Sequence, residues 1–305
     1  MKSVRTTEHA DGASGLPMNP GGFCEMCWSR WILCILLAFL LLYRCVAAAE
    51  TSSAPATGPA DARALFWTGR YDEAARAYDE LGRQEGQRVS AAVGASRAFA
   101  SRGRYEDALR RLEAVRAEAA RSADWLLARA EGLRGVGRLD EAIAEASRAV
   151  EIDPRQTAGR RLLGELYEEH GEQARAVEQY AWFEAILRRG LPPRASSLTD
   201  AGIALARHTA LTHPADAVQR TRRVLQELLQ AAYDRADKNY WPARLAAADL
   251  LLSKYNLDQA AEDYRAALAI NPKLADAHVG LGLIALEGWR FEETEKHVAA
   301  ALAVN

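Results

Sequence analysis

The chain has 305 residues, of which 49% are hydrophobic and 26% charged, and its formal net charge at pH 7 is −2. This apolar fraction is enough for two average domains or one extended array. The near-neutral balance gives no reason to expect a nucleic acid or an anionic membrane surface as a partner, and we predict neither.

The N-terminal part contains an uninterrupted apolar segment, Trp31–Tyr43, preceded by Arg30. Its length suits the core of a secretory signal peptide, and Ala47-x-Ala49 offers small residues for cleavage. The alternative is an uncleaved anchor over positions 31–49, because a segment of that length is near the minimum that crosses hydrocarbon. Both interpretations send the rest of the chain across a membrane. We therefore predict an exported protein, periplasmic or extracellular, or one anchored through residues 31–49.

The true start is open between Met1 and Met26, since the later methionine leaves a signal peptide of more ordinary length. Residues 1–49 are thus predicted as signal peptide or anchor. Residues 50–59, with the sequence ETSSAPATGP, are small and polar, which is typical of a flexible linker.

All four cysteines lie before residue 50, and two of them form a lone Cys24-x-x-Cys27 pair. A structural zinc site normally needs a second pair of ligands, and none follows. We predict no metal site and no cofactor.

A glycine recurs at a constant interval in the first half of the remaining chain. These turn glycines are Gly69, Gly103, Gly137 and Gly171. Small or apolar residues follow each glycine at spacings of 4 and 3, beginning with Ala74, Ala108, Ala142 and Ala176. Such spacing marks one face of a helix, and a second apolar face precedes each glycine. Each unit is therefore predicted to be two helices joined by a glycine turn, and stacked units bury one another's faces.

The segments GRLDEAIAEASRAVEIDP at 137–154 and LLGELYEEHG at 162–171 resemble the tetratricopeptide repeat (TPR) family. Two further units, at 255–272 and 289–305, fit the same pattern through residues such as Ala260. Pro154 and Pro272 close two units, because proline cannot continue a helix but suits the first turn of the next one. The resemblance implies an all-α, right-handed solenoid of about seven antiparallel helix pairs.

The repeat pattern divides the chain into three parts. We predict repeats 1–4 over residues 60–190 and repeats 6–7 over 241–305. Between them, residues 191–240 form one degenerate, elongated repeat that lacks the turn glycine. The sequence LPPR at 191–194 is expected to end the preceding helix near Arg189.

No catalytic pattern accompanies the repeats. The six histidines form no HExxH motif, and the glycines form no phosphate-binding loop. His170 is expected to be a solvated helix-end residue, and His278 and His297 are expected at the surface or in a groove. Acidic pairs such as Asp72-Glu73 start second helices, where they favour the helix dipole. We predict that the protein is not an enzyme.

Tryptophans of the array are expected to pack in the core. These are Trp125, Trp182, Trp241 and Trp289. Trp67, at the end of a short first helix, is expected to be partly exposed.

In the TPR family the first helix of each pair lines a concave groove. The resemblance places seven charged residues there: Arg97, Glu131, Arg134, Arg161, Glu165, Glu168 and Asp249. Their charges are mixed, so no ligand of a single sign is implied. The carboxylate clamp of some TPR proteins does not carry over, because Val93, Leu127 and Leu245 occupy corresponding positions. The groove is predicted to bind a protein or peptide.

We predict a non-catalytic binding scaffold that acts outside the cytoplasm, in a cell-envelope assembly. One alternative is the recognition arm of a larger exported enzyme, such as a peptidase, with a catalytic domain beyond residue 305. Another is an accessory that handles lipid or glycan. The last helix is expected to leave Val298, Ala301 and Leu302 uncovered, which favours further chain or a docking partner after Asn305.

Overall fold

The computed structural model describes residues 58–190 and 193–305. The predicted signal peptide or anchor, the cysteines and nearly all of the linker lie outside these residues. Among the helices of the described part, none combines the length and the apolar character that crossing a membrane requires.

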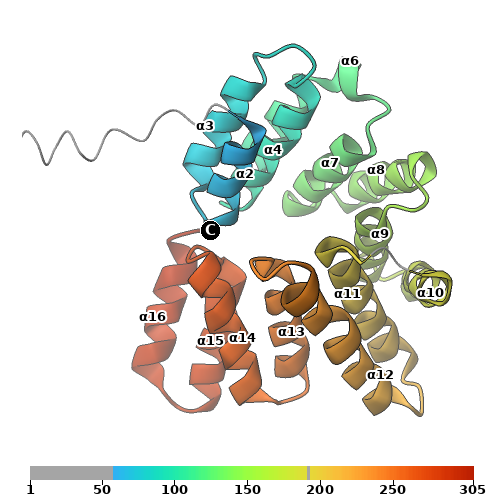
Figure 1. Cartoon of the computed structure of the whole chain (residues 1–305), viewed down its shortest axis with the longest axis vertical. Helices are drawn as coiled ribbons and strands as arrows, with labels where there is room; N and C mark the ends of the chain where they lie inside the picture. The colour runs from blue at the N-terminus through green and yellow to red at the C-terminus, as the bar shows by residue number, and fades with distance from the viewer. Residues whose placement is uncertain (1–57, 191–192) are drawn as a thin grey trace, which may run out of the picture. The chain divides into compact units, whose positions relative to one another are not determined.

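Every regular element in the described ranges is a helix, and the helices pair in chain order (Figure 1). The seven pairs are α2 (Pro59–Trp67) with α3 (Tyr71–Leu81), α4 (Arg88–Ala100) with α5 (Tyr105–Glu113), α7 (Ala123–Gly135) with α8 (Leu139–Ile152), α9 (Thr157–Glu169) with α10 (Gln173–Arg189), α11 (Ala195–Thr212) with α12 (Ala217–Arg223), α13 (Trp241–Ser253) with α14 (Leu257–Ile270), and α15 (Ala275–Glu287) with α16 (Phe291–Leu302). A single turn, α6 (Arg116–Ala119), precedes α7. Two π-helical segments, Val224–Leu229 and Ala232–Ala236, follow α12. The prediction of an all-α solenoid of about seven helix pairs is confirmed.

The turn positions recur as the period predicts. Their φ angles are +77° at Gly69, +66° at Gly103, +77° at Gly137 and +87° at Gly171. In the last two repeats the same position is occupied by Tyr255 and Trp289, with φ angles of +59° and +57°. Both side chains project from the turn, and Trp289 is 79% exposed. The expectation that Trp289 packs in the core is therefore wrong, whereas Trp125, at 2% exposure, is buried as expected.

Two prolines that close repeats lie in turns and do not begin the next helix. Pro154 precedes α9 by three residues, and Pro272 precedes α15 by the same number. The expectation that they occupy the first turn of the next helix is corrected, because two further turn residues intervene in each case. Helix α10 does end at Arg189, before the LPPR segment.

Neighbouring helices approach closely wherever the repeat provides a small side chain. Ala142 is completely buried on α8. On α9, a Cβ atom at Gly164 would lie 2.4 Å from the ring of Tyr180, which is itself fully buried. The pattern of small residues therefore sets the spacing between stacked helices, as close packing requires.

The first helix pair contacts the later repeats. Asn271, which follows α14, is completely buried; its Nδ2 donates to the Tyr71 hydroxyl at 2.9 Å, and its Oδ1 accepts from the Lys273 amide at 3.0 Å. The ring of Trp67 lies 5.4 Å from that of Tyr240, between centroids. We call these interactions the closure contacts.

The closure contacts also change the expectation for the last helix. Ala301 is only 7% exposed, and Val304 packs with Tyr71 and Ala74 of the first pair. Val298 and Leu302, at 48% and 73% exposure, do lie at the surface. The expectation of three uncovered residues therefore holds for two of them and is wrong for Ala301.

The substitution Ala142→Arg tests the helix stacking, and Ala144→Arg on the exposed face of the same helix is its matched control. Because Ala142 has no exposed surface, the arginine overpacks the interface and buries a charge, and we expect a loss of several kcal/mol in the free energy of unfolding. The control should change it by less than about 0.5 kcal/mol. Urea denaturation measures both, and equal small effects would contradict the helix register.

Gly69→Ala should open the closure contacts. A Cβ at Gly69 would lie 2.3 Å from the Asn271 Oδ1, whereas at Gly137, which has the same φ of +77°, it would meet nothing within 4 Å. Gly137→Ala therefore isolates the cost of the left-handed backbone, about 1–2 kcal/mol. We expect Gly69→Ala to cost more than this control in chemical denaturation.

The double variant Gly69→Ala/Asn271→Ala provides a further check. Once the colliding amide is removed, the excess cost of Gly69→Ala over Gly137→Ala should disappear. An excess that survives the loss of Asn271, or no excess at all, would show that the contact does not hold the two ends together.

Candidate functional site

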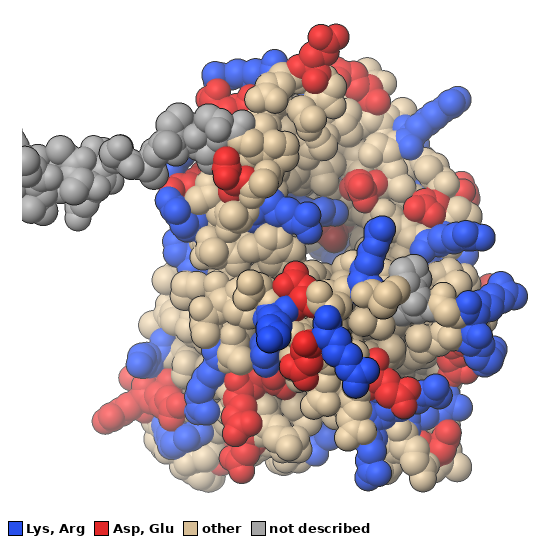
Figure 2. All heavy atoms as spheres, viewed as in Figure 1, with Lys and Arg blue, Asp and Glu red and all other residues tan. Residues whose placement is uncertain are grey.

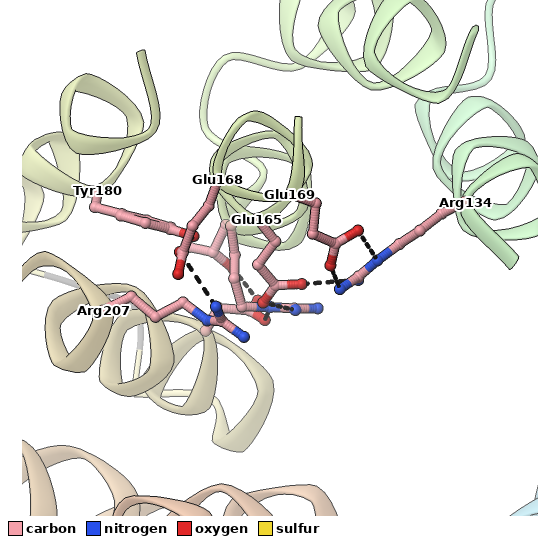
Figure 3. A network of polar contacts seen from close by, with 9 residues as sticks. Arg134, Glu165, Glu168, Glu169, Tyr180 and Arg207 are labelled. Carbon is pink, nitrogen blue, oxygen red and sulfur yellow. Dashed lines mark hydrogen bonds and ion pairs between the residues drawn. The ribbon is translucent and has the colours of Figure 1, made fainter. Parts of the chain in front are cut away.

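Four of the seven predicted groove residues belong to one polar network on α7, α9, α10 and α11 (Figure 3). We call it the inner network. Its members are Arg134, Thr157, Arg161, Glu165, Glu168, Glu169, Tyr180, Asp200 and Arg207.

Arg161 is the centre of this network. Its Nε donates to Asp200 Oδ1 at 2.8 Å, and its Nη1 donates to Glu165 Oε1 at 2.6 Å. Burial acts to lower the pKa of Arg161, but the two carboxylates outweigh it and raise that pKa. Burial likewise acts to raise the pKa of Glu165, yet Arg161, Arg134 and Arg207 together lower it below its usual value of 4.5. The charges therefore stabilise each other inside the protein.

The other branches of the network are also paired. Glu168 accepts from the Tyr180 hydroxyl at 3.0 Å and from Arg207 Nη1 at 3.2 Å. Arg134 donates its Nε to Glu169 Oε2 at 3.0 Å and its Nη1 to Glu165 Oε2 at 3.0 Å. These residues hold α7, α9 and α11 together, and their charges are already engaged.

A pocket of about 570 Å³, here called the inner pocket, lies beside the network, between α9, α11 and α13. It contains the predicted residues Arg161, Glu165 and Asp249. One wall is apolar, with Ile203, Ala206, Pro242, Leu245 and Ala246. The charged side chains Lys254 and Asp276 also line it. Within the described residues, neither of these two forms an ion pair.

Asp249, on α13, is one of the acidic groups that line this pocket. Its Oδ1 accepts from the Tyr264 hydroxyl at 2.6 Å. Burial raises the pKa of Asp249, and the nearby Asp276 acts in the same direction, while the Tyr264 bond acts to lower it. The pocket therefore presents carboxylates that repel one another and would be stabilised by a hydrogen-bond donor or a cation.

Arg97 and Glu131 lie apart from the inner network. Arg97 lines a separate pocket of about 620 Å³ with Arg63 and Trp67. Glu131 is half-buried on α7. It lines neither the inner pocket nor the pocket that contains Arg97. A third pocket, of about 650 Å³ near α12 and α14, contains none of the predicted groove residues.

Several residues of the site were absent from the sequence prediction. They are Arg63, Trp67, Asp200, Arg207, Tyr240 and Asp276. Asp200 and Arg207 belong to the degenerate repeat, which has no period to assign a face. The sequence signal that could have placed them is the length of α11, since a helix of 18 residues has one face long enough to line the inside of the array.

His278 and His297 lie together on α15 and α16, with their Nδ1 atoms 3.2 Å apart. Over the described ranges, no group of three or more histidine, cysteine, aspartate or glutamate side chains is placed to hold a metal ion. His170 directly follows α9, with its Nε2 3.1 Å from an oxygen of Asp140.

No family model and no curated protein matches the sequence. Solved structures do match. The chain is similar to a human IFIT1 dimer with m7Gppp-AAAA at 14% identity and a TM-score of 0.51, over 79% of this chain and 58% of that one. It is similar to a tetratricopeptide repeat protein from Parabacteroides merdae at 15% identity and a TM-score of 0.49, over 80% and 90%. For YrrB, a TPR protein with an unusual peptide-binding site, the identity is 21% and the TM-score 0.35, over 64% and 92%.

With seven stacked helix pairs and this similarity, the chain has the fold of tetratricopeptide-repeat proteins. The resemblance inferred from the repeats is confirmed at the level of the fold. Similarities at identities of 14–21% show the fold alone.

Acid should weaken the inner network. The folded-state pKa of Glu165 is lowered, so its contribution to stability is present above about pH 4.5 and is lost as the pH falls through the folded pKa. We expect urea denaturation to show a fall in stability from pH 6 to pH 3.5 that is smaller in Glu165→Gln than in the unsubstituted protein. Gln retains an oxygen acceptor and removes the titrating group. An identical pH dependence in both proteins would contradict this assignment.

Proposed function

We propose that the protein is a non-catalytic scaffold that binds a protein or peptide across the inner faces of its first helices. The observation that carries the proposal is the inner pocket, where an apolar wall adjoins charged groups that have no ion-pair partner among the described residues. Figure 2 shows a hollow at this face, bordered by both basic and acidic side chains.

An extended peptide fits this arrangement chemically. Its apolar side chains can pack against Ile203, Ala206 and Leu245, which stabilises the complex by about 25 cal/mol per Å² of apolar surface removed from water. Its amide or ammonium groups can donate to Asp249 and Asp276. Members of the inner network also line this pocket and are paired with one another, so the site is preformed and loses little entropy on binding.

A nucleic acid is the second candidate, since the human IFIT1 structure contains m7Gppp-AAAA. The inner pocket argues against it, because Asp249 and Asp276 would face a phosphate backbone. The net charge of −2 adds no general attraction.

We also propose that this binding takes place outside the cytoplasm, in an envelope assembly. Support comes from the apolar segment at 31–43 and the small residues before residue 50. N-terminal sequencing of the protein produced in a Gram-negative host checks this, since an intact leader in the soluble cytoplasmic fraction would contradict export. A larger exported enzyme that uses this array as its recognition arm is the alternative.

The peptide proposal is tested with two matched double variants. Ala210→Trp/Asp276→Arg fills the inner pocket and reverses one of its charges. Ala299→Trp/Asp258→Arg makes the same changes at exposed positions of α16 and α14. Peptides selected by phage display on the unsubstituted protein should lose at least about tenfold in affinity with the first variant. With the second they should lose less than about twofold.

Calorimetry with synthetic peptides provides the measurement. Selection of no peptide, or equal binding by the pocket variant and the unsubstituted protein, would contradict the proposal. If a capped oligoadenylate binds instead and the peptides do not, the nucleic-acid candidate replaces it.

A further inference from the structure

The last helix pair carries two histidines that face each other. His278 lies on α15 and His297 on α16, and their Nδ1 atoms are 3.2 Å apart. The ring planes meet at 37°, with 5.5 Å between the ring centroids. We call these residues the histidine pair. Neither of them lines the inner pocket, so what they do is independent of the proposed function.

The packing of α15 on α16 brings the two rings together. Gly282 follows His278 by one helical turn on the same face. A Cβ atom at Gly282 would lie 3.5 Å from the Cβ atom of His297. Because no side chain of Gly282 separates the helices, the His297 ring can extend along α15 as far as His278. The two histidines are 19 residues apart in the chain, so no short motif reveals the pair.

The other ring nitrogen of His278 fixes which nitrogen carries the proton. His278 Nε2 lies 3.3 Å from the carbonyl oxygen of Pro272. A carbonyl oxygen only accepts, so Nε2 carries the proton and donates it, and Nδ1 keeps a lone pair that faces His297. Histidine ligands of metal ions are oriented in the same way, by a hydrogen bond from the second ring nitrogen to a carbonyl or carboxylate oxygen.

The distance between the Nδ1 atoms fits two ligands of one metal ion. Two nitrogen ligands of a tetrahedral zinc ion lie about 3.3 Å apart, given the usual Zn–N bond length. The observed distance of 3.2 Å therefore requires almost no movement of the rings. A hydrogen bond between the two neutral rings is the alternative, and this distance is at the long end of the usual range for such a bond.

The surroundings favour the neutral form of the histidines, which is the form that binds metal. Burial lowers the pKa of His297, and the neighbouring His278 acts in the same direction. Lys296 and Arg265 also act to lower that pKa, while Glu293 acts to raise it. A neutral imidazole loses no proton when it binds a cation. Imidazole nitrogen suits zinc, copper and nickel ions, whereas magnesium and calcium prefer oxygen ligands.

We infer that His278 and His297 bind one divalent ion of the zinc class between their Nδ1 atoms, and that the ion joins α15 to α16. The other coordination positions are open to water, since in the described part of the chain no third histidine, cysteine, aspartate or glutamate completes a group with them. The Pro272 carbonyl that orients His278 follows Asn271, which forms the closure contact to Tyr71. The ion therefore stabilises the last helix pair next to the closure contacts.

Calorimetric titration of the full chain with ZnCl₂ tests the inference. The four cysteines, all before residue 50, are alkylated first, because thiolates also bind zinc. We expect zinc to bind with a Kd below about 100 µM, and His278→Gln and His297→Gln each to weaken it at least about tenfold. Circular dichroism checks that both variants keep their helical content.

His170→Gln is the matched control. The two ring nitrogens of His170 lie 3.1 Å from oxygens of Asp140 and Glu172, so this variant removes an imidazole that also has potential ligands beside it. It should change the affinity for zinc by less than about twofold. No binding of zinc up to about 1 mM, equally tight binding of MgCl₂, full affinity in either variant of the pair, or an equal loss in the control would overturn the inference.

Nuclear magnetic resonance of the histidine rings gives a measurement that needs no variant. The chain has six histidines, and long-range ¹H–¹⁵N spectra resolve their ring nitrogens. On addition of ZnCl₂ the Nδ1 signals of two histidines should shift together, with the same dependence on zinc concentration. A shift at one histidine alone, or at none, would show that the pair does not share an ion.

Discussion

The packing of the first helix pair against the later repeats depends on the buried amide of Asn271. In a stack of helix pairs each pair contacts its neighbours, so small differences in packing add up along the chain. The hydrogen bond from Asn271 to Tyr71 joins residues 200 positions apart. It therefore limits how far these packing differences can accumulate between them. Trp67 of the first pair also packs against Tyr240, which lines the inner pocket. A buried amide tolerates little displacement, because loss of either hydrogen bond leaves it unsatisfied.

The helix pairs could be predicted because their cause is local and repeated. A left-handed turn needs glycine at lowest cost, and a close helix contact needs a small residue such as Ala142; both recur once in each of the first four repeats. The closure contacts could not be predicted in this way, since the interaction of Asn271 with Tyr71 occurs once. The placement of α11 was equally hidden, because the degenerate repeat gives no register.

For the site, the sequence predicted the helix face but not the partners. Arg134 and Arg161 do lie on first helices, yet both are paired. Arg134 pairs with Glu165 of the next repeat, and Arg161 pairs with Glu165 on its own helix and with Asp200 on α11. Ion pairs between helices determine which charged side chains remain available to a ligand. The sequence of a single helix does not show these pairs. Arg97, Glu131 and Asp249 are the predicted residues that form no ion pair within the described part of the chain.

Contact between the first and last pairs also changes how the array can come apart. A linear stack frays from its ends, because a terminal pair has one neighbour and an inner pair has two. Here the contacts of Tyr71, Asn271 and Val304 give α2–α3 and α15–α16 a second neighbour each. Neither end is then a weak starting point for unfolding. Local openings that would be independent in a linear stack become coupled, and the chain must close a long loop before the last contacts form, which slows folding and favours a single cooperative transition.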